Sequence, residues 1–180
     1  MYQKVIKLFI HTPTADVSDV NLTWWMKAIN KLGGKLFINN SYSGSCVSTG
    51  GSSASQSMER LSKLVVNGET PDVIIIYMGS NDCHAPYTVN SFKSAYKKML
   101  TNLKQLCPNS EIVLCTLPTS NLYTKENQNA YNNVITEFAT NYKLVNLDKV
   151  DITNYLVDSA HPNKDGMEKI AEQIVKDMLK

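Results

Sequence analysis

The chain has 180 residues, a hydrophobic content of 43%, a charged content of 19% and a formal net charge of +2. This length suits a single domain with a sizeable core, and the proportions are ordinary for a globular protein. The small net charge gives no argument for binding nucleic acid or an acidic membrane surface, and no apolar run reaches the length of a membrane span. The first residues lack the apolar core of a signal peptide, so the chain as it stands is expected to be cytoplasmic; loss of an N-terminal signal would instead imply secretion.

The cysteines and the basic residues exclude several kinds of site. Cys46, Cys83, Cys107 and Cys115 show no CxxC spacing, which indicates free thiols and no metal site. Arg60 is the sole arginine, which argues against a bidentate clamp for phosphate or carboxylate. We therefore expect neither a metal nor an organic cofactor.

Apolar patterns along the chain predict strands that alternate with helices. Runs rich in β-branched and aromatic residues predict strands at 4–10, 35–38, 72–78, 111–117 and 143–147. Apolar residues at helical spacing predict helices at 19–32, 58–68, 90–106, 125–142 and 163–179. Residues 41–55 are rich in serine and glycine and are expected to form a loop. This alternation predicts one α/β domain over 1–180, a three-layer α/β/α sandwich around a flavodoxin-like parallel sheet of order 2-1-3-4-5.

Two of three notable motifs follow predicted strands, at the sheet edge where such folds bind ligands. Gly79-Ser80-Asn81-Asp82 follows the most apolar strand, and the Asn81 amide there is suited to donate to a developing oxyanion. The alternative is a simple strand-ending turn, for which these residue types are common. Gly44 lies after the second strand, where the missing Cβ lets a backbone N–H approach a substrate closely. A flexible loop or a phosphate-binding nest over 41–55 is the alternative for Gly44.

The third motif pairs a carboxylate with a histidine before the last helix. Asp158 and His161 are three positions apart, a spacing that lets the carboxylate accept from Nδ1–H and leaves Nε2 free as a general base. The alternative is a surface histidine in a helix-entry loop. His84, which follows the second motif, is interpreted as a loop bystander rather than a residue that lines the pocket.

Together and in this order, the three motifs resemble those of the SGNH, or GDSL-type, hydrolase family. The resemblance covers roughly residues 14–180, and Thr23-Trp24-Trp25 and residues 39–44 are similar to a bacterial subgroup. It implies an esterase or lipase-like enzyme without a cofactor, acting on a small-molecule, carbohydrate or lipid ester. It also implies that Gly44 and Asn81 form the oxyanion hole, that His161 is the base and that Asp158 orients it.

The sequence departs from this family at the nucleophile. The family carries Gly-Asp-Ser at the end of its first strand, whereas here His11-Thr12-Pro13 follows the predicted strand 4–10. Thr12 offers a hydroxyl, but threonine is a hindered nucleophile and serines beside Gly44 are poorly placed to attack a carbonyl held there. We therefore leave the nucleophile unassigned, interpret strand 4–10 as divergent or truncated, and expect slow or absent hydrolysis. The alternative function is a non-catalytic α/β domain that binds a ligand or partner in the same crevice.

Overall fold

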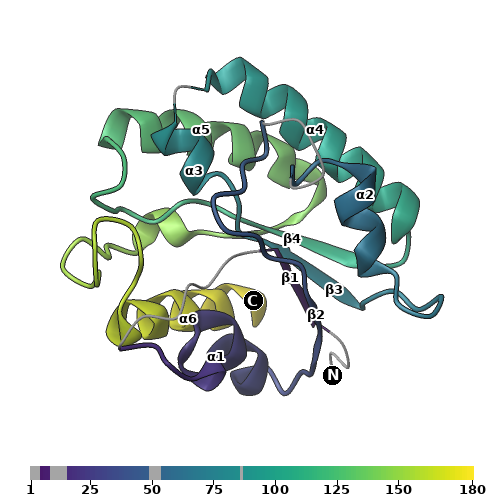
Figure 1. Ribbon diagram of the computed structural model, residues 1–180, viewed down its shortest axis with the longest axis horizontal. Helices are drawn as coiled ribbons and strands as arrows, with labels where there is room; N and C mark the ends of the chain where they lie inside the picture. Colours follow the sequence, from purple (N-terminus) through teal and green to yellow (C-terminus); the bar gives the residue numbers. More distant parts are fainter. Residues whose placement is uncertain (1–4, 9–15, 49–53, 86) are drawn as a thin grey trace.

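The computed structural model describes residues 5–8, 16–48, 54–85 and 87–180 of the protein (Figure 1). Its centre is a parallel sheet of order β2-β1-β3-β4-β5. The strands are β1 (Val5–Leu8), β2 (Leu36–Asn39), β3 (Val73–Ile76), β4 (Glu111–Cys115) and β5 (Lys143–Val145). The predicted parallel sheet and its flavodoxin-like order are therefore confirmed.

Strand β1 occupies the slot between β2 and β3. Leu8 lies opposite Ile76 of β3, and Lys7 lies opposite Asn39 of β2. Because all three strands are parallel, their carboxyl ends meet at one edge of the sheet. The slot is filled by the chain's own residues, so the pairing of β2 and β3 requires no strand from a second molecule.

Helices cover both faces of this sheet, which confirms the predicted three layers (Figure 1). The elements α1 (Trp24–Lys31) and α6 (Lys164–Met178) lie together on one face. The other face carries α2 (Met58–Leu61), α3 (Ser80–His84), α4 (Val89–Leu106) and α5 (Lys125–Phe138). None of the helices in the described residues is both long enough and apolar enough to cross a membrane.

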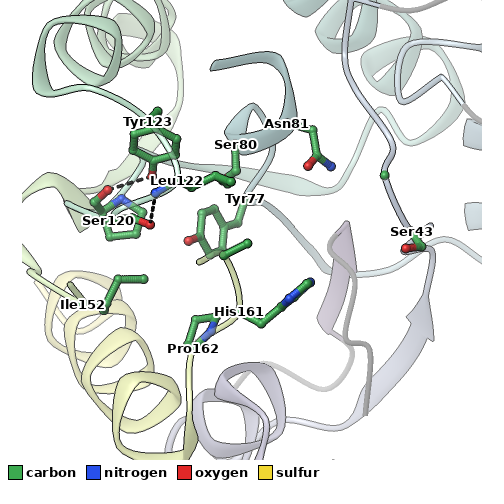
Figure 2. A pocket seen from close by; sticks show the side chains of 13 residues that line it. Ser43, Tyr77, Ser80, Asn81, Ser120, Leu122, Tyr123, Ile152, His161 and Pro162 are labelled. Atoms are coloured by element: carbon green, nitrogen blue, oxygen red, sulfur yellow. Dashed lines mark hydrogen bonds between the residues drawn. The ribbon is translucent and has the colours of Figure 1, made fainter. Parts of the chain in front are cut away.

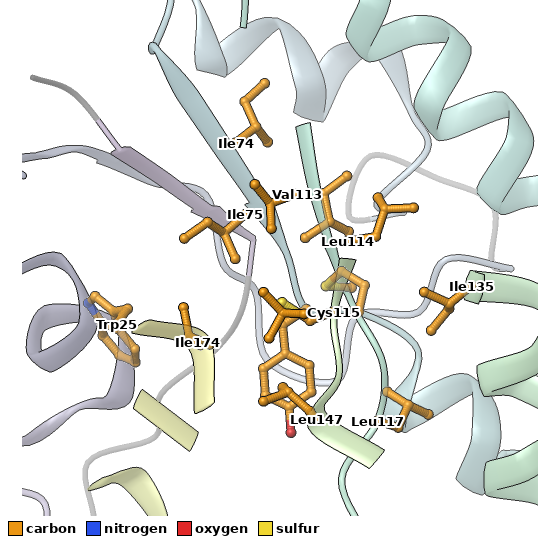
Figure 3. Close-up of a cluster of buried hydrophobic side chains, with 14 of the residues drawn as sticks. Trp25, Ile74, Ile75, Val113, Leu114, Cys115, Leu117, Ile135, Leu147 and Ile174 are labelled. Carbon is orange, nitrogen blue, oxygen red and sulfur yellow. The ribbon is translucent and has the colours of Figure 1, made fainter. Parts of the chain in front are cut away.

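The core lies on both sides of β3, whose four residues are all buried. Figure 3 shows Trp25 of α1 and Ile174 of α6 on one side of the sheet and Ile135 of α5 on the other. Burial on both faces explains why β3 reads as an unbroken apolar run rather than an alternating one.

Several elements are shorter than the sequence predicts, and at two of the breaks a side chain hydrogen-bonds the backbone. The predicted helix 19–32 is divided into the 3-10 turn η1 (Val20–Leu22) and α1, since Thr23 is extended and its hydroxyl donates to the Val20 carbonyl. Strand β4 ends early, and the Leu117 N–H beyond it donates to the Asn132 side chain at 2.7 Å. The predicted helices 58–68 and 125–142 and strand 143–147 likewise pass into the 3-10 turns η2 (Ser62–Leu64), η3 (Ala139–Asn141) and η4 (Leu147–Lys149).

Candidate active site

Asn81 is placed at the sheet edge by a short helix that the sequence analysis did not predict. Gly79 turns the chain out of the β3 direction with φ of +118°, in the left-handed region that favours glycine. A Cβ at this position would lie 3.0 Å from Cζ of Phe92, so steric crowding also favours glycine. Helix α3 follows directly, and Asn81 stands in its first turn. The motif is therefore the start of a helix rather than a simple turn.

The Asp158 carboxylate is held firmly against His161. Oδ2 of Asp158 lies 2.7 Å from Nδ1 of His161, while Oδ1 accepts the backbone N–H groups of Ala160 and His161 at 2.7 Å each. The hydrogen bond from the His161 side chain is the main cause that lowers the pKa of Asp158 to about 2. The ionised carboxylate thus fixes the tautomer of the imidazole, with the proton on Nδ1 and Nε2 left to act as a base.

One hollow at the carboxyl edge of the sheet brings the predicted site residues together. Gly44, Asn81 and His161 all line this hollow, which is open to solvent. Figure 2 shows the His161 ring, the Asn81 amide and Ser43 around the same opening. Gly44 has φ of +66°, so its backbone conformation also favours glycine.

The loop that carries Gly44 is attached to α3 at its tip. Nδ2 of Asn81 donates to the Ser45 carbonyl at 3.0 Å. The fully buried carboxylate of Asp82 accepts the backbone N–H groups of Val47 and Ser48 at 2.8 and 2.7 Å. The loop and the helix are therefore connected by hydrogen bonds from two consecutive α3 residues.

The same loop is held at its base by Arg60, which is completely buried. The guanidinium donates to the Asn40 carbonyl at 2.8 Å and to the Ser55 hydroxyl at 3.2 Å, and it lies over the Tyr42 ring at 4.8 Å. Asn40 in turn donates to the Arg60 carbonyl at 3.0 Å. Burial lowers the pKa of Arg60 to about 10. The sole arginine thus has a structural role at the base of the loop, which the sequence analysis did not predict.

Residues after β3 and β4 form the opposite wall of the hollow, and the sequence analysis did not select them. They are Tyr77, Ser80, Pro118, Ser120, Leu122 and Tyr123. Tyr123 Oη donates to the Pro118 carbonyl at 2.8 Å, and the Leu122 N–H donates to the Ser120 hydroxyl at 3.2 Å. All of these residues follow β3 or β4, and their position after a parallel strand is the signal from which the sequence could have predicted them.

His84 lies outside the hollow lining, as the interpretation of a bystander predicts. It is exposed at the end of α3, and its Nδ1–H donates to the Leu122 carbonyl at 2.8 Å. The four cysteines are buried free thiols, and the described residues contain no group of three side chains arranged to hold a metal ion.

Comparison with known proteins then identifies the family. The model of the GDSL-like lipase/acylhydrolase family matches residues 6–178 of the chain. The chain belongs to this family. No curated protein matches it.

Several solved structures share the GDSL-family fold. A GDSL-like lipase from Bacteroides ovatus is 24% identical, with a TM-score of 0.70 and 99% of each chain covered. The psychrotrophic esterase EstA from Pseudoalteromonas is 18% identical with a TM-score of 0.72, covering 98% of this chain and 97% of the other. A family 3 carbohydrate esterase from Talaromyces cellulolyticus is 16% identical with a TM-score of 0.72, covering 98% and 96%. At these identities the similarity establishes the fold.

Within the residues that the structure describes, no candidate nucleophile contacts His161. Thr12, the weak sequence candidate, lies outside the described residues. Ser43, Ser80 and Ser120 line the hollow, but within the described part of the chain no serine or threonine hydroxyl hydrogen-bonds the His161 ring. The structure therefore brings together four of the five predicted site residues and leaves the attacking group unassigned.

The lowered pKa of Asp158 predicts how Asp158→Asn will respond to pH. A carboxyl whose pKa is lower in the folded state stabilises the fold above its unfolded pKa, near 3.8, and this contribution is lost as pH falls through about 2. The difference in unfolding free energy between wild type and Asp158→Asn should shrink as pH falls from 5 toward 2. Urea unfolding at each pH in this range measures it; a difference that does not shrink would contradict the assignment.

Proposed function

We propose that the protein is an ester hydrolase in which His161 is the general base and Asp158 orients it. The observation that carries the proposal is the convergence of His161, Gly44 and Asn81 on one hollow, with the His161 ring held by Asp158 at 2.7 Å. A base and two hydrogen-bond donors around one opening are what acyl transfer requires besides a nucleophile.

The proposed reaction cleaves a carboxylic ester through an acyl-enzyme. His161 Nε2 takes the proton of an attacking hydroxyl, and the new bond to the ester carbon places negative charge on the former carbonyl oxygen. The Gly44 N–H and the second Asn81 amide proton, which Ser45 does not use, stabilise that oxyanion. His161 then gives its proton to the leaving alkoxide, and a water activated in the same way releases the acid.

A sugar acetate or a related short ester is the substrate class we favour. Three of the similar structures are carbohydrate esterases, one from Talaromyces cellulolyticus and two from Clostridium thermocellum. Ser43, Ser80 and Ser120 bring hydroxyl groups to the lining of the hollow, which suits a hydroxylated substrate better than a long acyl chain.

Replacing His161 by alanine should abolish most hydrolysis of p-nitrophenyl acetate. Removal of the general base should lower the enzyme-dependent rate by roughly 10²-fold or to the buffer rate, because proton transfer typically contributes about 10²–10⁴-fold. His84→Ala is the matched control: it removes a histidine that does not line the hollow, so it should leave most of the activity. Equal activity in wild type and His161→Ala would refute the proposed base.

The second candidate function is binding without catalysis, because no hydroxyl in the described part of the chain contacts His161. In that case the hollow binds an acetylated sugar or a partner without turning it over. NMR spectra recorded with an acetylated sugar distinguish the two functions. If the protein only binds, resonances around Gly44 and Asn81 shift but no product forms, even after long incubation.

A further inference from the structure

Asp82 stands next to the oxyanion candidate Asn81 but faces away from the hollow. Its side chain is completely buried and is not among the residues that line the hollow. Its two oxygens accept from consecutive backbone N–H groups, those of Val47 and Ser48, at 2.8 and 2.7 Å. Both of these hydrogen bonds lead to the loop that carries Gly44, which indicates a role toward that loop.

This contact matters because the two oxyanion donors come from separate elements. Gly44 follows β2, while Asn81 lies on α3, and the Asn81–Ser45 contact joins residues 36 positions apart. Gly44 itself has φ of +66° and no side chain that could anchor it. An oxyanion hole requires both donors to aim at one atom, so the relative position of loop and helix must be fixed.

We propose that Asp82 is the positioning residue that holds the Gly44 N–H in register with the Asn81 amide. The inference rests on the proposed function for the identity of the two donors. Asp82 touches no substrate; it acts through the backbone at Val47 and Ser48 and so through the loop.

The chemistry of the contact explains why a carboxylate is needed. Both oxygens of a carboxylate accept hydrogen bonds, so one side chain can bind two adjacent N–H groups. Asparagine has nearly the same shape, but its NH₂ group would face one of those N–H groups as a second donor. Asp82→Asn therefore breaks one of the two bonds with little change in volume.

The test compares Asp82→Asn with Asp177→Asn. Asp177 is also buried, and it accepts the backbone N–H of Asn146 at 2.9 Å, but it lies on α6 and does not line the hollow. With p-nitrophenyl acetate we expect Asp82→Asn to lower kcat by roughly 10- to 100-fold with KM little changed, since small misplacement of a catalytic group has effects of this size. Asp177→Asn should lose thermal stability but keep kcat.

A second readout does not depend on turnover. In ¹⁵N–¹H spectra, Asp82→Asn should shift the Gly44 amide resonance and speed hydrogen exchange at Val47 and Ser48, whereas Asp177→Asn should leave all three unchanged. If Asp82→Asn does not fold, Asp82→Glu, which keeps the charge but moves it by one methylene, serves for the same comparison.

The outcomes separate this inference from the proposed function. Loss of stability alone, with unchanged kcat and an unchanged Gly44 resonance, would show that Asp82 is merely structural and would overturn the inference. Absence of any His161-dependent hydrolysis in the wild type would refute the proposed function, while the Gly44 shift would still decide whether Asp82 positions the loop.

Discussion

Replacement of His11-Thr12-Pro13 by Gly-Asp-Ser should raise hydrolysis of p-nitrophenyl acetate by roughly two orders of magnitude or more. The loss of a triad serine costs about 10⁶-fold in kcat where it has been measured, and an oxyanion hole with binding alone leaves roughly 10³–10⁴-fold acceleration over water. The gain that we expect is much smaller than the cost of losing a triad serine, because the rest of the chain has not evolved around the introduced segment.

The topology gives the reason for choosing this segment. Leu8 ends β1 opposite Ile76, so the carboxyl end of β1 lies at the same sheet edge as that of β3, after which α3 follows. Figure 2 shows the tip of β1 directed into the space between Ser43 and His161. A serine that follows β1 closely is therefore suited to meet the base from the side opposite the Tyr77 wall.

Two variants make the experiment decisive. The same replacement ending in alanine, Gly-Asp-Ala, differs from Gly-Asp-Ser by a single oxygen atom and should show no gain. Thr12→Ala in the otherwise unchanged chain should have little effect. If the unchanged chain is already fast and Thr12→Ala abolishes the activity, then Thr12 is the nucleophile and the interpretation of a missing block is wrong.

The parts of the fold that the sequence predicted are those set by local apolar pattern. The run Val73–Ile76 could be recognised because burial on both faces leaves no polar positions in it, and strand order followed from alternation with helices. Element ends were less predictable because they depend on distant partners. The Leu117 N–H, for example, binds Asn132 from α5, and nothing near Leu117 in the sequence indicates that.

The candidate site likewise has contacts that the sequence could predict and contacts that it could not. Asp158 and His161 are close in sequence, so their hydrogen bond could be predicted from spacing alone. Asp82 received no role of its own from the sequence, because its partners Val47 and Ser48 lie 35 and 34 positions away in the chain. Long-range contacts between a side chain and a backbone have no sequence pattern, and the anchors of the Gly44 loop are of this kind.

Replacing Arg60 by methionine should destabilise the protein by about 2–4 kcal/mol, the largest stability effect we expect from a single polar residue here. Methionine fills much of the same space but removes the donors to the Asn40 carbonyl and the Ser55 hydroxyl, which are both buried. Buried acceptors that lose their donors cost about 1–3 kcal/mol each. In a chain of this length the melting temperature should fall by roughly 5–15 °C.

Lys63→Met is the matched control because Lys63 lies near the same ring from the solvent side. Its Nζ is 5.2 Å from the centre of the Tyr42 ring and 2.7 Å from the Tyr42 hydroxyl, but the residue is exposed. Exposed contacts of this kind contribute little, so Lys63→Met should change the unfolding free energy by no more than about 0.5 kcal/mol. Equal losses in the two variants would show that the Tyr42 ring, rather than the buried hydrogen bonds of Arg60, holds the base of the loop.

Because Arg60 joins both ends of the segment that carries Gly44, the Arg60→Met variant should also broaden the Gly44 amide resonance at temperatures below unfolding, whereas Lys63→Met should not.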